Sequence, residues 1–138
     1  MEKSSSELIE HLKLIQNVIG RMAENSSRIK GWAVSTSLAI DAFAILHKNN
    51  GIAKLTYLPV FIFAVLDFNY LKQEKNYRSL YTIALKNPNN VTFDLSTNHL
   101  DKSTKLKNLI EAIKSWSIYL FYVPLLVGAV CVNFIKLN

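Results

Sequence analysis

Three stretches of this chain are almost free of charged residues. Residues 31–46 read GWAVSTSLAIDAFAIL, with Asp41 as their single charge, and residues 55–71 contain Asp67 as their single charge. Residues 115–135 contain no charged residue at all. A membrane-spanning helix needs roughly 20 mainly apolar residues. The pattern therefore predicts three transmembrane helices.

The aspartate in the first stretch makes it a weak span by itself. An aspartate near a helix centre costs about 3 kcal/mol on an insertion scale, and each large apolar residue returns about 0.5 kcal/mol. Insertion is then nearly neutral, so this helix needs a partner. The turn-forming sequence Asn49-Asn50-Gly51 supplies one by folding the chain back. We expect residues 31–71 to form a transmembrane hairpin, and the competing interpretation is a hairpin in a soluble core.

The first thirty residues form a polar segment with a regular apolar stripe. Ser4-Ser5-Ser6-Glu7 is a capping-box pattern that marks a helix start. The stripe repeats at alternating spacings of four and three residues, typical of an amphipathic helix, and consists of Leu8, Leu12, Ile15, Ile19 and Met22. It packs either on the chain's own second polar segment or on further copies of the chain, and the spacing leaves both open.

The second polar segment, 72–114, predicts helical extensions of the neighbouring spans. The second span continues as a helix to Lys86, where Asn87-Pro88-Asn89-Asn90 stops it. Residues 91–95 are expected to be extended. From about Asp101 a helix leads into the third span.

Composition and charge agree with a small membrane protein of one domain, residues 1–138. Half of the residues are hydrophobic and 19% are charged, against about 25% in soluble domains. The net charge is +6, and thirteen of the sixteen Lys and Arg residues precede the first span or lie between the second and third. Basic residues stay on the cytosolic side. We therefore expect an all-α membrane protein whose N-terminus and 72–114 segment face the cytosol.

Catalytic and metal-binding patterns are missing from the sequence. No glycine loop for phosphate and no nucleophile motif is present, and the single cysteine, Cys131, excludes an internal disulfide. The three histidines, His11, His47 and His99, fall on different predicted elements. The sequence therefore predicts no enzyme, no metal site and no cofactor.

Asp41 and Asp67 have different expected roles. Asp41 shares a helix face with Ser37, and ionisable groups inside a span usually face a bundle interior or a water-filled path. Ser37 and Asp41 either line a pore built by several copies, or Asp41 is a structural aspartate bonded to a neighbouring span. Asp67 lies near the cytosolic end of its span, at the level of Arg28 and Lys30, and is expected to form an ion pair.

Basic and aromatic residues alternate at the start of the second polar segment. Lys72, Lys75 and Arg78 are interleaved with tyrosines at positions 70, 77 and 81. Cations beside stacking rings suit a nucleotide or a single-stranded nucleic acid. The same composition also follows from the topology rule and from anionic lipid head groups.

Several strings in residues 13–81 resemble a known family. The opening Ile15-Gln16-x-Val18-Ile19-x-Arg21-Met22-Ala23, followed by Lys30-Gly31-Trp32 and Tyr57-Leu58-Pro59-Val60, is similar to small membrane proteins of bacterial defence islands. Leu66-Asp67-x-x-Tyr70-Leu71-x-Gln73-Glu74 continues the match. The chain resembles the membrane effectors of Hailong-type anti-phage systems, which pair a membrane protein with a nucleotidyltransferase. It departs from the family around residues 35–37 and Asp41, where more apolar residues are usual.

The resemblance implies an oligomeric, ion-channel-like effector in the bacterial inner membrane. A nucleotide or DNA oligomer made by the nucleotidyltransferase would hold it inactive, and release would depolarise the cell. We expect a homo-oligomer, with four copies as the first estimate. The candidate ligand contacts are Arg21, Arg28, Lys30, Lys72, Lys75 and Arg78. The alternatives are a membrane scaffold that recruits a cytosolic partner through helix 1–30, and a holin-like lysis protein.

Overall fold

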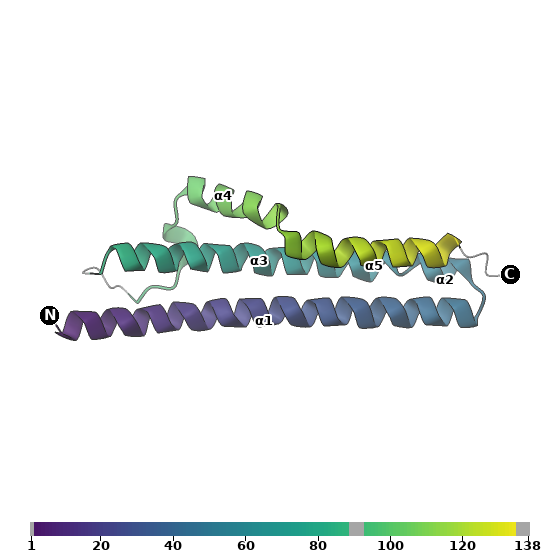
Figure 1. Ribbon diagram of the computed structural model, residues 1–138, viewed down its shortest axis with the longest axis horizontal. Coiled ribbons are helices and arrows are strands. Elements are labelled where there is room, and N and C mark those ends of the chain that lie inside the picture. Colours follow the sequence, from purple (N-terminus) through teal and green to yellow (C-terminus); the bar gives the residue numbers. More distant parts are fainter. Residues whose placement is uncertain (1, 89–92, 135–138) are drawn as a thin grey trace. The chain divides into compact units, whose positions relative to one another are not determined.

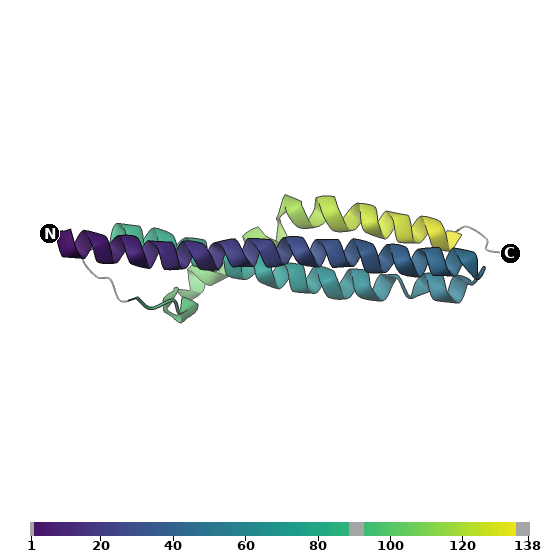
Figure 2. The same cartoon turned by 90° about the horizontal axis from the view of Figure 1, so that it is seen from below.

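The chain is almost entirely helical (Figures 1 and 2). The computed structural model describes residues 2–88 and 93–134, with side chains from residue 6 onward. Its elements are α1 (Glu2–Leu46), α2 (Asn50–Lys54), α3 (Tyr57–Lys86), a short 3₁₀ helix η1 (Thr97–His99), α4 (Lys102–Ile113) and α5 (Trp116–Phe134). Helix makes up 88% of the structure, and the described residues contain no strand. The predicted all-α class is confirmed.

Three helical stretches are long and apolar enough to cross a membrane. They run over Ser6–Leu46, Asn50–Lys86 and Lys102–Phe134, and each contains one of the apolar runs seen in the sequence. The number of candidate spans therefore agrees with the prediction.

The chain divides into two compact units, which are described separately. Unit 1 comprises Met1–Asn25 and Tyr70–Lys114, and unit 2 comprises Ser26–Asn69 and Ser115–Asn138. Both α1 and α3 contribute one part to each unit. Unit 1 thus collects the polar segments of the sequence, and unit 2 collects the apolar ones.

Small residues let the helices of unit 2 pack closely. Ala33, Ala44, Ala53 and Ala129 are all buried, and small side chains allow neighbouring helix backbones to approach. Ala33 forms a core cluster with Val60 and Tyr122, against which Phe63, Ala64, Ile118, Phe121 and Leu125 pack. The core of unit 2 therefore takes side chains from α1, α3 and α5.

A proline explains why the chain breaks between α2 and α3 at the start of the second apolar run. Pro59 has no N–H, so it cannot donate to the carbonyl of Leu55 four residues earlier, and its ring crowds that carbonyl. Leu55 O accepts instead from the N–H of Leu58 at 3.1 Å. The chain consequently leaves helical geometry at residues 55–56, between α2 and α3.

The predicted turn at 49–51 lies slightly earlier in the structure. Helix α1 ends at Leu46, and Lys48 adopts a left-handed backbone with φ of 50°. Asn49 then caps α2, because its Oδ1 accepts from the N–H groups of Gly51 (2.8 Å) and Ile52 (3.3 Å). The reversal therefore occupies residues 47–49, and Asn50 and Gly51 belong to a helix.

In unit 1 the apolar stripe of α1 is partly covered by the chain itself. Ile15 and Ile19 are at most 5% exposed, and Leu8, Leu12 and Met22 are half-buried. Packing on the chain's own second polar segment was one of the two interpretations left open, and the structure contains it.

Three other boundaries in unit 1 were predicted. Helix α3 ends at Lys86 and α4 starts at Lys102, both as expected. The expected start at residues 4–7 is wrong, because α1 already begins at Glu2. Of the expected extended segment, residues 91–92 lie outside the described residues, and Phe93 has a left-handed φ of 51°.

Candidate ligand groove and polar interior

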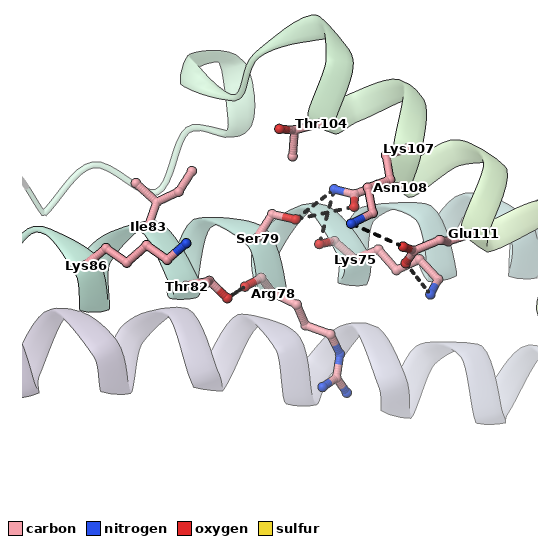
Figure 3. Close-up of a pocket in the computed structure, with 10 residues that line it drawn as sticks. All are labelled: Lys75, Arg78, Ser79, Thr82, Ile83, Lys86, Thr104, Lys107, Asn108 and Glu111. Carbon is pink, nitrogen blue, oxygen red and sulfur yellow. Dashed lines mark hydrogen bonds and ion pairs between the residues drawn. The ribbon is translucent and has the colours of Figure 1, made fainter.

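A basic groove of about 450 Å³ lies between α3 and α4 in unit 1 (Figure 3). Four cationic side chains and one carboxylate line it, together with hydroxyl and amide groups. The lining residues are Lys75, Arg78, Ser79, Thr82, Ile83, Lys86, Thr104, Lys107, Asn108 and Glu111. On each helix these positions recur every three or four residues, so they share one helix face.

A buried asparagine holds the two walls of the groove together. Asn108 of α4 is 5% exposed and donates from Nδ2 to Asn76 Oδ1 and to Ser79 Oγ, both at 3.0 Å. Asn76 and Ser79 belong to α3, and Asn76 is also buried. Buried amides are stabilising only when they are hydrogen-bonded. Asn108 therefore fixes the register of α4 along α3.

The ion pairs in the groove are long or exposed. Lys75 Nζ lies 3.4 Å and Lys107 Nζ 3.9 Å from the carboxylate of Glu111, and all three side chains are at least a quarter exposed. Arg78 pairs with Glu74 at 2.7 Å on α3 itself, and its guanidinium points away from α4 (Figure 3). Exposed pairs of this kind contribute about 0–1 kcal/mol. A competing anion can therefore replace Glu111 as the partner of either lysine at little cost.

The groove offers donors to phosphate oxygens and no surface for base stacking. Lys75 and Lys86 are 11 residues apart on α3, which corresponds to about 16 Å along a helix, long enough for more than one phosphate group. None of the lining residues is aromatic. The tyrosines at 70, 77 and 81, expected beside the cations, lie on α3 outside the groove. This groove therefore does not combine its cations with stacking rings, and the combination expected at residues 70–81 stays a prediction.

The predicted ligand contacts are distributed over both units. Lys75 and Arg78 line the groove, whereas Lys72 does not. Arg21 is an exposed residue of α1 in unit 1, and Arg28 and Lys30 belong to unit 2. The structure brings together only two of the six.

Two groove cations were missed as ligand contacts. Lys86 and Lys107 complete the lining, and no ion-pair partner of Lys86 is found in the part of the chain that the structure describes. Their signal in the sequence was positional: Lys75, Ser79, Thr82 and Lys86 repeat at helical spacing, as do Thr104, Lys107 and Glu111.

Two histidines that looked unrelated line one small hollow in unit 1. His11 of α1 and His99 of η1 face a space of about 220 Å³ together with Asp94. His99 Nε2 lies 2.7 Å from Asp94 Oδ2, and the N–H of Ser96 donates to Asp94 Oδ1. The bond from Ser96 and then that from His99 hold the pKa of Asp94 below its ordinary value of 3.8. Within residues 2–88 and 93–134 no cluster of His, Cys, Asp and Glu suits a metal ion.

Unit 2 contains a buried polar line on the inner face of α1. Ser37 is 1% and Asp41 is 8% exposed. Thr56, fully buried at the break before α3, donates from Oγ1 to Asp41 Oδ1 at 2.5 Å. The hydrogen bond is the contact expected of a structural aspartate. The pore-lining role of Ser37 and Asp41 stays a prediction.

Asp67, the second buried carboxylate of unit 2, has an ionic partner. Lys30 Nζ lies 2.7 Å from its Oδ2, and the Ser26 hydroxyl donates to its Oδ1 at 2.5 Å. The carboxylate is fully buried, and Lys30 also donates to Ser26 Oγ at 2.8 Å. The ion pair expected for Asp67 is present, with Lys30 as the partner, so Lys30 is already engaged within the chain.

The outer surface of unit 2 is apolar around these polar groups. In residues 31–46, 57–66 and 116–134 the only charged side chain is the buried Asp41. Large apolar side chains are exposed on all three helices, among them Leu38, Phe61 and Leu120. Exposed apolar side chains in this number indicate a contact with a membrane or with protein.

Comparisons with protein-family models, with curated proteins and with solved structures find no match for this chain. What the structure defines is an all-helical protein with three helices that could span a membrane, a basic groove and a polar interior.

Proposed function

We propose that this protein is an anti-phage effector of the bacterial inner membrane that forms an ion-channel-like homo-oligomer. A nucleotide or a DNA oligomer made by a partner nucleotidyltransferase holds the oligomer inactive, and its release depolarises the infected cell. The N-terminus and the groove face the cytosol, and four copies are the first stoichiometry to test. The proposal combines the family resemblance of residues 13–81 with the chemistry of the two units.

The observation that carries the proposal is the separation of charge between the units. Unit 2 exposes apolar side chains and no charge over residues 31–46, 57–66 and 116–134, and unit 1 contains a groove lined by four cations. Lipid is the solvent that suits the first surface. A polyanion is the ligand that suits the second. A protein with both surfaces can respond to a soluble anion with a change in the membrane.

The groove supports a phosphate-containing ligand more directly than a free base. Its cations and hydroxyls are donors without an aromatic platform, so contacts go to phosphate and sugar oxygens. Such contacts carry little sequence information and weaken steeply with salt. We therefore propose an oligonucleotide bound through its backbone.

Ser37 and Asp41 support conduction because they place oxygen atoms in the interior of unit 2. Ions cross a membrane protein where such groups replace their hydration shell. In this proposal the conducting path runs along the inner face of α1.

The alternatives have less support. The scaffold hypothesis needs an exposed apolar face on helix 1–30, and Ile15, Val18 and Ile19 are covered within unit 1. A holin-like lysis protein gives no role to the basic groove. We keep both as outcomes that the following experiment separates from the main proposal.

The test is ion flux through purified protein reconstituted into liposomes, with and without single-stranded DNA oligomers. We expect flux from ligand-free protein and inhibition by the oligomer. Lys86→Glu combined with Lys107→Glu reverses two charges in the groove, so we expect the apparent affinity to fall at least about tenfold. Lys13→Glu with Lys105→Glu, which reverses two charges of unit 1 outside the groove lining, is the matched control and should inhibit like the wild type.

Each outcome of this experiment has one meaning. Absence of flux under all conditions contradicts the channel, and a partner protein captured without flux favours the scaffold. Flux that no oligomer inhibits favours the lysis protein. Equal loss of inhibition in both double variants contradicts the groove as the ligand site.

A further inference from the structure

The two buried aspartates of unit 2 differ in how their charge is neutralised. Asp67 is fully buried and has the ammonium group of Lys30 at 2.7 Å. Asp41 is 8% exposed, and its hydrogen bond comes from the neutral hydroxyl of Thr56. No cationic side chain pairs with Asp41 within the described residues, since Lys48 and Lys54, the nearest cations along the chain, are both exposed. An uncompensated buried carboxylate costs several kcal/mol. Asp41 therefore has no cationic partner within the described part of the chain.

Two further oxygen atoms of unit 2 are buried without a hydrogen-bond partner. Ser37, which is 1% exposed, lies one helical turn before Asp41 on the same face of α1, and its Oγ has no partner. Asn133 of α5 also has an unpartnered Oδ1. Buried polar atoms without a partner are rare in folded proteins. Ser37 Oγ and Asn133 Oδ1 are therefore candidates for contact with a ligand.

A series of hydrogen bonds connects Asn133 of α5 to Asp41 of α1 through Ala53 and Thr56. The Asn133 Nδ2 donates to the carbonyl of Ala53 at 3.3 Å, and that carbonyl also accepts the N–H of Thr56 at 3.2 Å. Thr56 in turn donates to Asp41. The break between α2 and α3 thus joins α1 and α5 through a chain of polar contacts.

We propose that Asp41, Ser37 and Asn133 form a binding site for an alkali cation, Na⁺ or K⁺, inside unit 2. A carboxylate, a hydroxyl and an amide oxygen are the hard ligands that such ions take. One cation could neutralise Asp41 and contact both Ser37 and Asn133, whereas a protonated Asp41 has a single O–H and can donate to at most one of these two oxygens. The inference goes beyond the proposed function, because the site exists in a single chain whether or not ions cross the membrane.

The test is thermal unfolding of the purified full chain in NaCl, KCl or choline chloride at equal ionic strength. A ligand that binds only the folded state raises the unfolding midpoint, and we expect a rise of about 3 °C in one alkali salt over choline. In Asp41→Asn this difference should vanish. Asp67→Asn, the other buried aspartate, should keep the difference although its overall stability falls.

Ser37→Ala provides a second readout that does not depend on Asp41. The substitution removes a buried hydroxyl without a partner, so in choline the variant should be as stable as the wild type or more stable. Its alkali-dependent rise should be at most half that of the wild type. Ser35→Ala, which removes an exposed hydroxyl two residues earlier, is the control and should respond like the wild type.

Three results would overturn the site: no alkali-dependent rise in the wild type, a rise in Asp41→Asn or Ser37→Ala as large as that of the wild type, or stabilisation by acid in choline without any response to alkali. The last would assign a proton to Asp41. Failure of the site and failure of the channel are distinguishable, because the first is measured by unfolding and the second by flux.

Discussion

At the scale of single residues, the ion pair of Asp67 could be predicted from the sequence. A carboxylate at the end of an apolar run needs a cation, and Lys30 lies just before the neighbouring run. In the structure the pair measures 2.7 Å, and Ser26 supplies a further hydrogen bond. The serine bonded to both partners makes the pair a small closed network. Removing one member of such a network lowers stability, because the remaining buried polar groups lose their partners.

Removing one partner of this ion pair should therefore destabilise the protein more than removing both partners. Lys30→Met leaves Asp67 buried without a cation, and we expect a loss of about 3 kcal/mol in the free energy of unfolding. The double variant Lys30→Met with Asp67→Leu should regain at least half of this loss. Denaturation of the purified protein in detergent measures both. If the double variant is less stable than Lys30→Met, the ion pair does not stabilise unit 2 as described.

The site residues that could not be predicted from the sequence are those brought together by the packing of one helix on another. Lys75 and Arg78 were recognisable as cations beside one another in the chain. Lys86 and Lys107 become groove residues only because Asn108 aligns α4 with α3. His11 and His99 likewise share a hollow through tertiary packing alone. Helical periodicity gives the face on which a residue lies, but it does not give the face that lies opposite.

At the scale of elements, helix ends were predictable where a local cause exists. Asn87-Pro88 ends α3 at Lys86, and Asp101 precedes α4. The break at residues 55–56, at the start of the second apolar run, also has a local cause in Pro59. The start of α1 at Glu2 has no such signal. Serines at positions 4–6 are compatible with the residue that caps a helix and equally with the first turn of a helix that has already begun.

The contact between α3 and α4 should depend on one side chain. Asn108→Ala removes the donor shared by Asn76 and Ser79 and leaves buried polar groups without partners, which costs about 2 kcal/mol. We expect faster hydrogen exchange in α4 and little change in α5. Leu106→Ala on the same helix, whose side chain is 57% exposed, is the control and should leave the exchange pattern unchanged. If the amides of α4 exchange equally slowly in Asn108→Ala and in the wild type, Asn108 does not hold α4 against α3.

At the scale of the whole molecule, the account depends on lipid as the solvent of unit 2. The three apolar runs of the sequence predict this, and the structure adds that their charges are either internal or placed at the ends of the runs. Asp41 and Asp67 are buried, and Lys48 and Lys54 lie in and just after the reversal between α1 and α3. The basic groove belongs to the other unit. Membrane insertion would therefore leave every exposed charge of the described chain outside the hydrocarbon layer.

Cysteine labelling in intact membranes tests this claim most directly. In a Cys131→Ser background, Val123→Cys places a thiol at a half-exposed position in the middle of α5, and Lys107→Cys places one in the groove. With a charged maleimide that does not cross membranes, we predict labelling of Lys107→Cys in inverted vesicles but not in spheroplasts. Val123→Cys should remain unlabelled in both. Labelling of Val123→Cys as fast as Lys107→Cys in inverted vesicles would show that water surrounds unit 2 and would contradict the account.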